Sequence, residues 1–160
     1  MVYAPSTVRP PEKPPFIDPR PYFLTVCTAH RHHLFGRVHQ GRMQLNDAGA
    51  MISRYWRHLP DGFTNVVLDA FVVMPDHLHG LMALMPPTGD AATALQLSDI
   101  VHAFTAITAR VYAHGVRRHG WLPCPTPLWQ PRYSGHVVCD EGDLDDLRRY
   151  IATKAFWWTG

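Results

Sequence analysis

The chain has 160 residues, 46% hydrophobic and 18% charged, a composition that suits one folded core and argues against a disordered protein. Fifteen basic residues, thirteen of them arginine, against thirteen acidic ones leave a net charge of only +2, so bulk charge does not indicate a nucleic-acid-binding protein. The sequence predicts neither a membrane-spanning helix nor a secretory signal. Three cysteines without metal spacing favour a reduced, cytoplasmic protein.

The N-terminal part of the chain predicts an arm followed by a strand. Seven prolines within residues 1–21 predict an extended arm, because proline fixes φ and lacks a backbone N–H. One domain is expected over residues 22–160. Its first strand is predicted at 22–31, where apolar residues alternate, with a ragged continuation to Val38.

A helix and a β-hairpin are expected next. Asn46 or Asp47 can cap a helix that runs to about Leu59. The β-branched run 65–75 predicts a strand buried on both faces. Residues 77–84 predict a second strand that returns beside it after a Pro-Asp turn.

The second half of the chain predicts two more helices and one strand. After a proline-rich loop at 86–89, apolar spacing predicts a long amphipathic helix at roughly 97–118. A strand is expected at 128–138, interrupted at Pro131. The closing helix, 140–158, carries its acidic residues first and its basic residues later, as the helix dipole favours.

The resulting order, β-α-β-β-α-β followed by a helix, predicts an α+β, ferredoxin-like (split βαβ) fold. We expect an antiparallel sheet with helices on one face and an added C-terminal helix. Many functions use this fold, so the function has to be argued from a site.

The segment MPDHLHG, residues 74–80, holds the first candidate site. Residues two apart in a strand point to the same face, so His77 and His79 project side by side while Leu78 enters the other layer. Two imidazoles at this spacing can share a metal ion and leave positions for water or a substrate phosphate. The alternative, which a bare His-x-His pattern by itself favours, is two histidines on a half-buried strand without a metal.

Tyr150 in the closing helix is the second candidate. Leu144, Leu147 and Ile151 form the apolar stripe of this helix, and Tyr150 and Lys154 fall together on one edge of it. A phenol at that edge can reach a groove between helix and sheet. The alternative is an ordinary boundary tyrosine with its ring inside and its hydroxyl outside.

The two candidates occur together in a known family. The chain resembles the HUH single-tyrosine transposases, and most closely the REP-associated tyrosine transposases and their insertion-sequence relatives, over roughly residues 22–158. The resemblance rests on the order and spacing of four blocks, YFLTVCTAHRHHLF (22–35), AFVVMPDHLHGLM (70–82), LWQPRYSGHVV (128–138) and RRYI (148–151).

The resemblance implies an enzyme that nicks and rejoins single-stranded DNA beside a hairpin, either REP-like or at an insertion-sequence end. It makes His77 and His79 ligands of a divalent metal, Mg²⁺ or Mn²⁺, and Tyr150 the nucleophile that forms a 5′-phosphotyrosine link. Relatives act as monomers or as homodimers, and both states stay open for this chain.

Lys154 is the main departure from the family pattern. The family usually places Asn or Gln four residues after the tyrosine, where in insertion-sequence members the side chain completes the metal site. An ammonium cannot ligate a metal and would repel it. Water or another residue could complete the site, Lys154 could replace part of the metal's electrostatic role, or the protein could have lost cleavage and kept binding.

Other residues have weaker signals. Asp76 could accept the second N–H of His77, or it could serve only as a turn residue. His136 matches a histidine frequent in the family, with a structural role as the alternative. The arginines expected to approach DNA phosphates are Arg31, Arg132, Arg148 and Arg149.

Three functions follow from these features. The first is a metal-dependent single-strand DNA transposase. The second is a domesticated protein that binds REP-like hairpins without cutting them, which Lys154 favours. The third is a His-metal hydrolase unrelated to DNA, which leaves the tyrosine unexplained.

Overall fold

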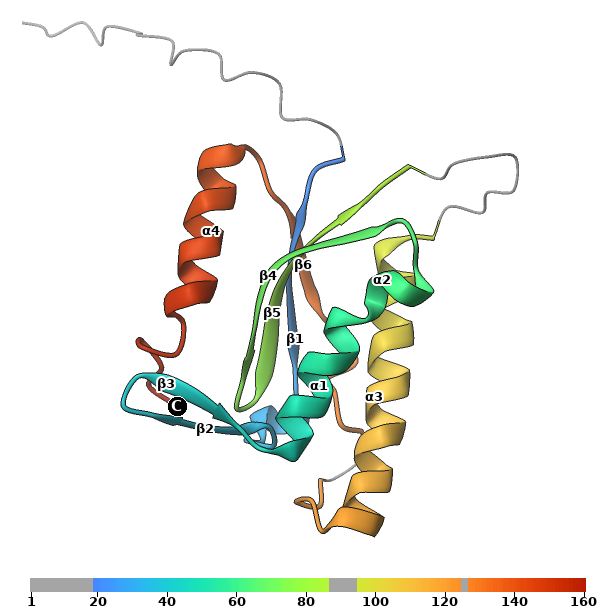
Figure 1. The fold of residues 1–160 in the computed structure, drawn as a ribbon, viewed down its shortest axis with the longest axis vertical. Helices are drawn as coiled ribbons and strands as arrows, with labels where there is room; N and C mark the ends of the chain where they lie inside the picture. The colour runs from blue at the N-terminus through green and yellow to red at the C-terminus, as the bar shows by residue number, and fades with distance from the viewer. Residues whose placement is uncertain (1–18, 87–94, 125–126) are drawn as a thin grey trace, which may run out of the picture.

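The computed structural model describes residues 19–86, 95–124 and 127–160. Most of the predicted N-terminal arm and part of the predicted loop at 86–89 lie outside these residues. The centre of the fold is an antiparallel sheet in the order β4-β5-β1-β6 (Figure 1). Its strands are β1 (Tyr22–Cys27), β4 (Val66–Met74), β5 (His77–Leu84) and β6 (Ser134–Val137).

Helices cover both faces of this sheet (Figure 1). Helices α1 (Asp47–Arg57) and α3 (Leu97–His119) pack on one face, where Trp56 and Phe104 form part of the larger core. Helix α4 (Glu141–Thr153) packs on the other face over a smaller apolar cluster made of Leu81, Val138, Leu144 and Ile151. This arrangement confirms the predicted ferredoxin-like fold with an added C-terminal helix.

Capping residues explain where the helices begin and end. Asn46 Oδ1 accepts a hydrogen bond of 2.9 Å from the N–H of Gly49 and so starts α1, as predicted. Asp140 caps α4 in the same way through the N–H of Asp143. Gly120, with a φ of 67°, ends α3 in the left-handed conformation.

The ragged strand expected up to Val38 was wrong. Strand β1 ends at Cys27, because His30 and Arg31 take positive φ values of 54° and 56° in a short 3-10 turn, η1 (Ala29–Arg31). A separate hairpin follows, made of β2 (Gly36–His39) and β3 (Arg42–Leu45). The Gln-Gly pair at 40–41, with φ values of 49° and 70°, forms its turn and was the signal that the prediction missed.

One predicted burial pattern and three predicted boundaries also need correction. Strand β4 is not buried on both faces, because it is an edge strand in which Val67 is 50% exposed. The predicted strand 128–138 shrinks to β6, and Trp129 only forms an isolated bridge. Helix α1 ends before Leu59, where a short helix α2 (Leu59–Gly62) begins. Helix α4 ends at Thr153, and turns occupy residues 154–157.

Candidate active site

Strand β5 carries the two predicted histidines on the α4 side of the sheet. Alternation puts His77 and His79 on the same face as Leu81 of the smaller core, while Leu78 belongs to the larger core. Gly80 also faces the larger core, where a Cβ atom would collide with the Trp56 ring. The glycine after the His pair therefore serves packing, since Trp56 fills the space above it.

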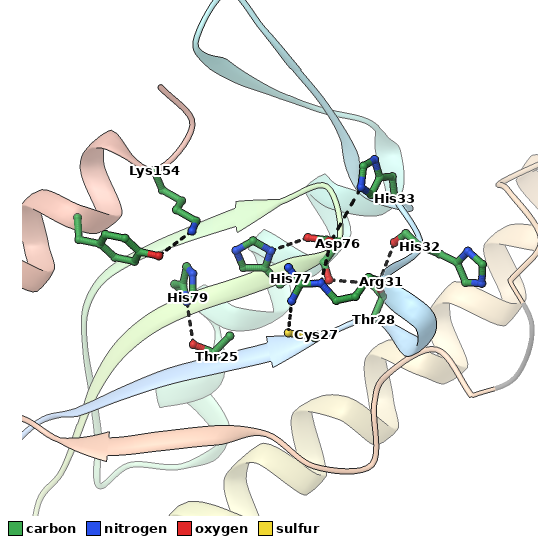
Figure 2. A network of polar contacts seen from close by, with 11 residues as sticks. Thr25, Cys27, Thr28, Arg31, His32, His33, Asp76, His77, His79 and Lys154 are labelled. Carbon is green, nitrogen blue, oxygen red and sulfur yellow. Dashed lines mark hydrogen bonds and ion pairs between the residues drawn. The ribbon is translucent and has the colours of Figure 1, made fainter. Parts of the chain in front are cut away.

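The two imidazoles lie against each other with one nitrogen of each held by hydrogen bonding. Their ring centroids are 4.5 Å apart, and His77 and His79 are only 2% and 7% exposed. His77 Nδ1 donates to Asp76 Oδ1 over 2.6 Å, and His79 Nδ1 lies 2.9 Å from Thr25 Oγ1 (Figure 2). Each Nε2 is left as the nitrogen able to bind a metal or a phosphate oxygen.

Burial keeps both imidazoles neutral at ordinary pH. Desolvation lowers the pKa of His79 to about 3, with further lowering from His77 and from the Lys154 ammonium. Desolvation also lowers the pKa of His77, and the hydrogen bond to Asp76 opposes this effect only in part. Neutral imidazole is the form that ligates metals, so no proton has to leave before an ion binds.

Asp76 is the buried centre of a polar network beside the His pair (Figure 2). Its side chain is 4% exposed, and Oδ2 accepts from Arg31 Nε over 2.9 Å while Oδ1 accepts from His77. The Arg31 guanidinium also contacts Cys27 Sγ at 2.7 Å. Asp76 was predicted as a neighbour of the active site and Arg31 as a contact to DNA phosphates. The structure brings the two side chains together, with Arg31 at a positive φ. A buried carboxylate needs such partners, because an unpaired charge would be costly.

Tyr150 reaches the same place from helix α4. Its ring centroid lies 5.5 Å from that of His79 and 6.1 Å from that of Phe23, which itself stacks on His79. Tyr150 is 41% exposed. Lys154 Nζ donates to this hydroxyl over 2.6 Å (Figure 2). The helical spacing thus places Tyr150 and Lys154 together as predicted, and tertiary packing adds the histidines.

An ion pair joins helix α4 to the edge of the sheet. Arg148 contacts both carboxylate oxygens of Asp69, the shortest distance being 2.6 Å, and also contacts Asp145. Asp69 lies at a bulge in β4, and the hydrogen bond from Arg148 lowers its pKa. Arg148 therefore ties α4, the helix that carries Tyr150, to strand β4.

The remaining predicted residues lie farther out. Arg149 pairs with Asp146 on the exposed side of α4. His136 sits opposite Phe23 in β6, near the Ser134 hydroxyl. Arg132 is exposed and lines a cavity on the α3 side of the sheet.

The sequence reasoning did not place Thr25 and Trp158 near the His pair. Thr25 faces His79 because β1 and β5 pair in that register, which no local pattern reveals. Trp158 lies with its ring centroid 5.7 Å from that of His77. The signal for it was the run of aromatic residues at 156–158, which the prediction treated as helix.

Within the ranges that the structure describes, no cluster of three or more His, Cys, Asp or Glu side chains could hold a metal ion. A metal held by His77 and His79 would need further ligands, which water, another residue or the substrate could supply. The same ranges contain no helix that is long and apolar enough to span a membrane.

Comparison with known proteins places the chain in a family. The model of the IS200-like transposases matches residues 22–154, so this chain belongs to that family, and a transposase-like function follows. An uncharacterized protein of Haemophilus influenzae is 30% identical over 148 residues, which cover 86% of this chain and 81% of that protein.

Two solved structures share the fold at 20% sequence identity. A candidate transposase of Deinococcus radiodurans aligns with a TM-score of 0.53 over 88% of this chain and 95% of its own. A REP-associated tyrosine transposase, solved bound to a REP hairpin, aligns with a TM-score of 0.50 over 87% of this chain and 68% of its own.

Proposed function

We propose that this protein nicks and rejoins single-stranded DNA beside a hairpin, in the cytoplasm, through a covalent 5′-phosphotyrosine link at Tyr150. The observation that carries the proposal is the 5.5 Å separation of the Tyr150 and His79 rings, which come from different elements. Membership in the IS200-like family supports the reaction class. The REP hairpin in the similarly folded transposase supports a hairpin as the DNA partner.

The chemistry follows from the position of the phenol. The Tyr150 oxygen attacks the scissile phosphorus, the bond from phosphorus to the 3′ oxygen breaks, and a 3′-hydroxyl leaves. The Lys154 ammonium, 2.6 Å from the attacking oxygen, stabilises the negative charge that develops as the phenol loses its proton. A 3′-hydroxyl that attacks the phosphotyrosine reverses the step, so no external energy source is required.

His77 and His79 are the residues that would hold a divalent ion, Mg²⁺ or Mn²⁺. Both rings are neutral and each has its Nδ1 engaged, which is the usual state of metal-binding histidines. Imidazole nitrogen suits Mn²⁺ better than Mg²⁺, which prefers oxygen. A bound ion would offset the charge of the scissile phosphate and orient it.

A second function, hairpin binding without cleavage, is favoured by one observation. Lys154 stands four residues after Tyr150, where the resemblance leads us to expect an amide side chain. Its ammonium contacts the phenol oxygen instead. The positive charge would weaken a metal site nearby through repulsion. A domesticated protein that only binds hairpins needs the fold but not a working metal site.

The test separates the two functions. The protein is incubated with hairpin oligonucleotides that carry single-stranded flanks, with and without Mg²⁺ or Mn²⁺. A denaturant-stable protein–DNA adduct that disappears in Tyr150→Phe supports the nicking enzyme. A shifted but uncut oligonucleotide supports the binding protein, and a hairpin that neither binds nor is cut contradicts both.

A further inference from the structure

The chain continues beyond helix α4 with an aromatic segment, which we define as residues 156–158. Trp157 and Phe156 are the two most exposed large hydrophobic side chains in the described part of the chain, at 71% and 67%. Their rings contact each other edge to face at 4.8 Å. Apolar rings held in water beside a candidate site indicate a binding surface.

Contacts at both ends hold the aromatic segment in place. Trp158 lies 5.7 Å, between ring centroids, from His77 and also 5.7 Å from His33. Phe156 packs on the turn of the β2–β3 hairpin, where a Cβ atom at Gly41 would come within 3.1 Å of its ring. Figure 1 shows the C-terminus beside this hairpin. The segment therefore links the His pair to the hairpin, and Trp157, which is 71% exposed, offers the most accessible ring.

The β2–β3 hairpin on which Phe156 packs is basic. Arg37, His39 and Arg42 are exposed on the β2–β3 hairpin, and residues 30–46 contain no Asp or Glu. Cationic side chains beside exposed aromatic rings match a single-stranded nucleic acid, whose phosphates pair with the cations while its bases stack on the rings.

We infer that Trp157 stacks on an unpaired base that flanks the scissile phosphate, with the neighbouring phosphates along the basic β2–β3 hairpin. This inference rests on the proposed function and adds a substrate-binding residue to it. Continuity with the site favours DNA as the occupant, because Trp158 in the same segment lies on His77. Trp157 would set the path of the strand towards Tyr150.

The test measures binding rather than cleavage, in a Tyr150→Phe background. The probe is a fluorescent oligonucleotide that joins a REP-like hairpin to an oligo-thymidine flank, followed by anisotropy. We expect Trp157→Ala to weaken binding by about tenfold, the loss typical of one stacked base. Trp157→Tyr should retain most of the affinity, because it keeps an aromatic face. Leu122→Ala, which removes a 56% exposed side chain beyond α3, is the matched control.

A second measurement identifies the base. Abasic sites are placed one at a time along the flank. An abasic site at one position should weaken binding of the parent protein by the same factor as Trp157→Ala. The abasic site and the substitution together should lower the affinity no more than either change alone. If Trp157→Ala binds the probe as tightly as the parent protein or more tightly, this inference is wrong and the proposed function stands. The same holds if the losses of affinity from Trp157→Ala and from an abasic site add up at every position of the flank. A parent protein that fails to bind the probe overturns the proposed function and this inference together.

Discussion

Lys154 and Tyr150 form one unit at the end of helix α4. The ammonium donates to the phenol oxygen over 2.6 Å and lies 4.8 Å from the centroid of the ring. The same cation contributes to the lowered pKa of His79, so it acts on both halves of the site.

Replacing Lys154 should separate DNA binding from chemistry. Lys154→Met removes the hydrogen bond to the Tyr150 oxygen, and we expect adduct formation in a single turnover to slow by about tenfold to a hundredfold, the range for a charged hydrogen bond. Hairpin affinity should stay within about twofold of the parent. Lys154→Arg keeps a cation and should recover part of the rate. An unchanged rate in Lys154→Met would mean that the ammonium has no role in the attack.

Asp76 should control metal affinity by orienting His77. Asp76→Asn removes the carboxylate that accepts the His77 N–H and pairs with Arg31, and we expect Mn²⁺ affinity to fall by about tenfold to a hundredfold. Calorimetric titration of Mn²⁺ measures this without any DNA. The matched control is Asp61→Asn, which breaks the exposed pair of Asp61 with His58. Equal Mn²⁺ affinity in both variants would contradict the orienting role.

The Asp69–Arg148 pair should stabilise the docking of α4 in a pH-dependent way. We expect Asp69→Asn to lower the free energy of unfolding by about 0.5–1 kcal/mol at pH 7, a value held down by partial exposure. The pKa of Asp69 is lowered in the fold, so its stabilisation is present above its ordinary pKa of 3.8 and is lost as pH falls through the folded value.

Urea unfolding at pH 7 and at pH values below 3.8 measures this difference. The difference in the free energy of unfolding between the parent protein and Asp69→Asn should become smaller as the Asp69 carboxylate of the parent is protonated. Asp146→Asn serves as the control, because its pair with Arg149 lies on the exposed side of α4. A gap of the same size at all pH values would exclude the charged pair as its cause.

Gly80 should tolerate no side chain because of the indole above it. In Gly80→Ala the new methyl group collides with the Trp56 ring. We expect the free energy of unfolding to fall by about 1–3 kcal/mol, the cost of overpacking. Gly62→Ala is the control, since nothing lies within 4 Å of a Cβ atom there. Equal stability of the two variants, measured by thermal unfolding, would show that the Trp56 ring moves aside freely.

Local periodicity in the sequence was enough to predict much of this protein. The order of strands and helices, the common face of His77 and His79, and the pairing of Tyr150 with Lys154 depend on residues close together in the chain, where backbone geometry dictates direction. The resemblance carried by these motifs led to the family, which the family comparison confirms.

Tertiary structure alone decided how these pieces meet. Packing of α4 on the face opposite α1 and α3 brings Tyr150 to His79, and strand register brings Thr25 to the same ring. Positive φ values turn Arg31 back to Asp76, and the chain after α4 lays Trp158 on His77. These contacts join residues far apart in sequence, and long-range packing, rather than any local pattern, determines them.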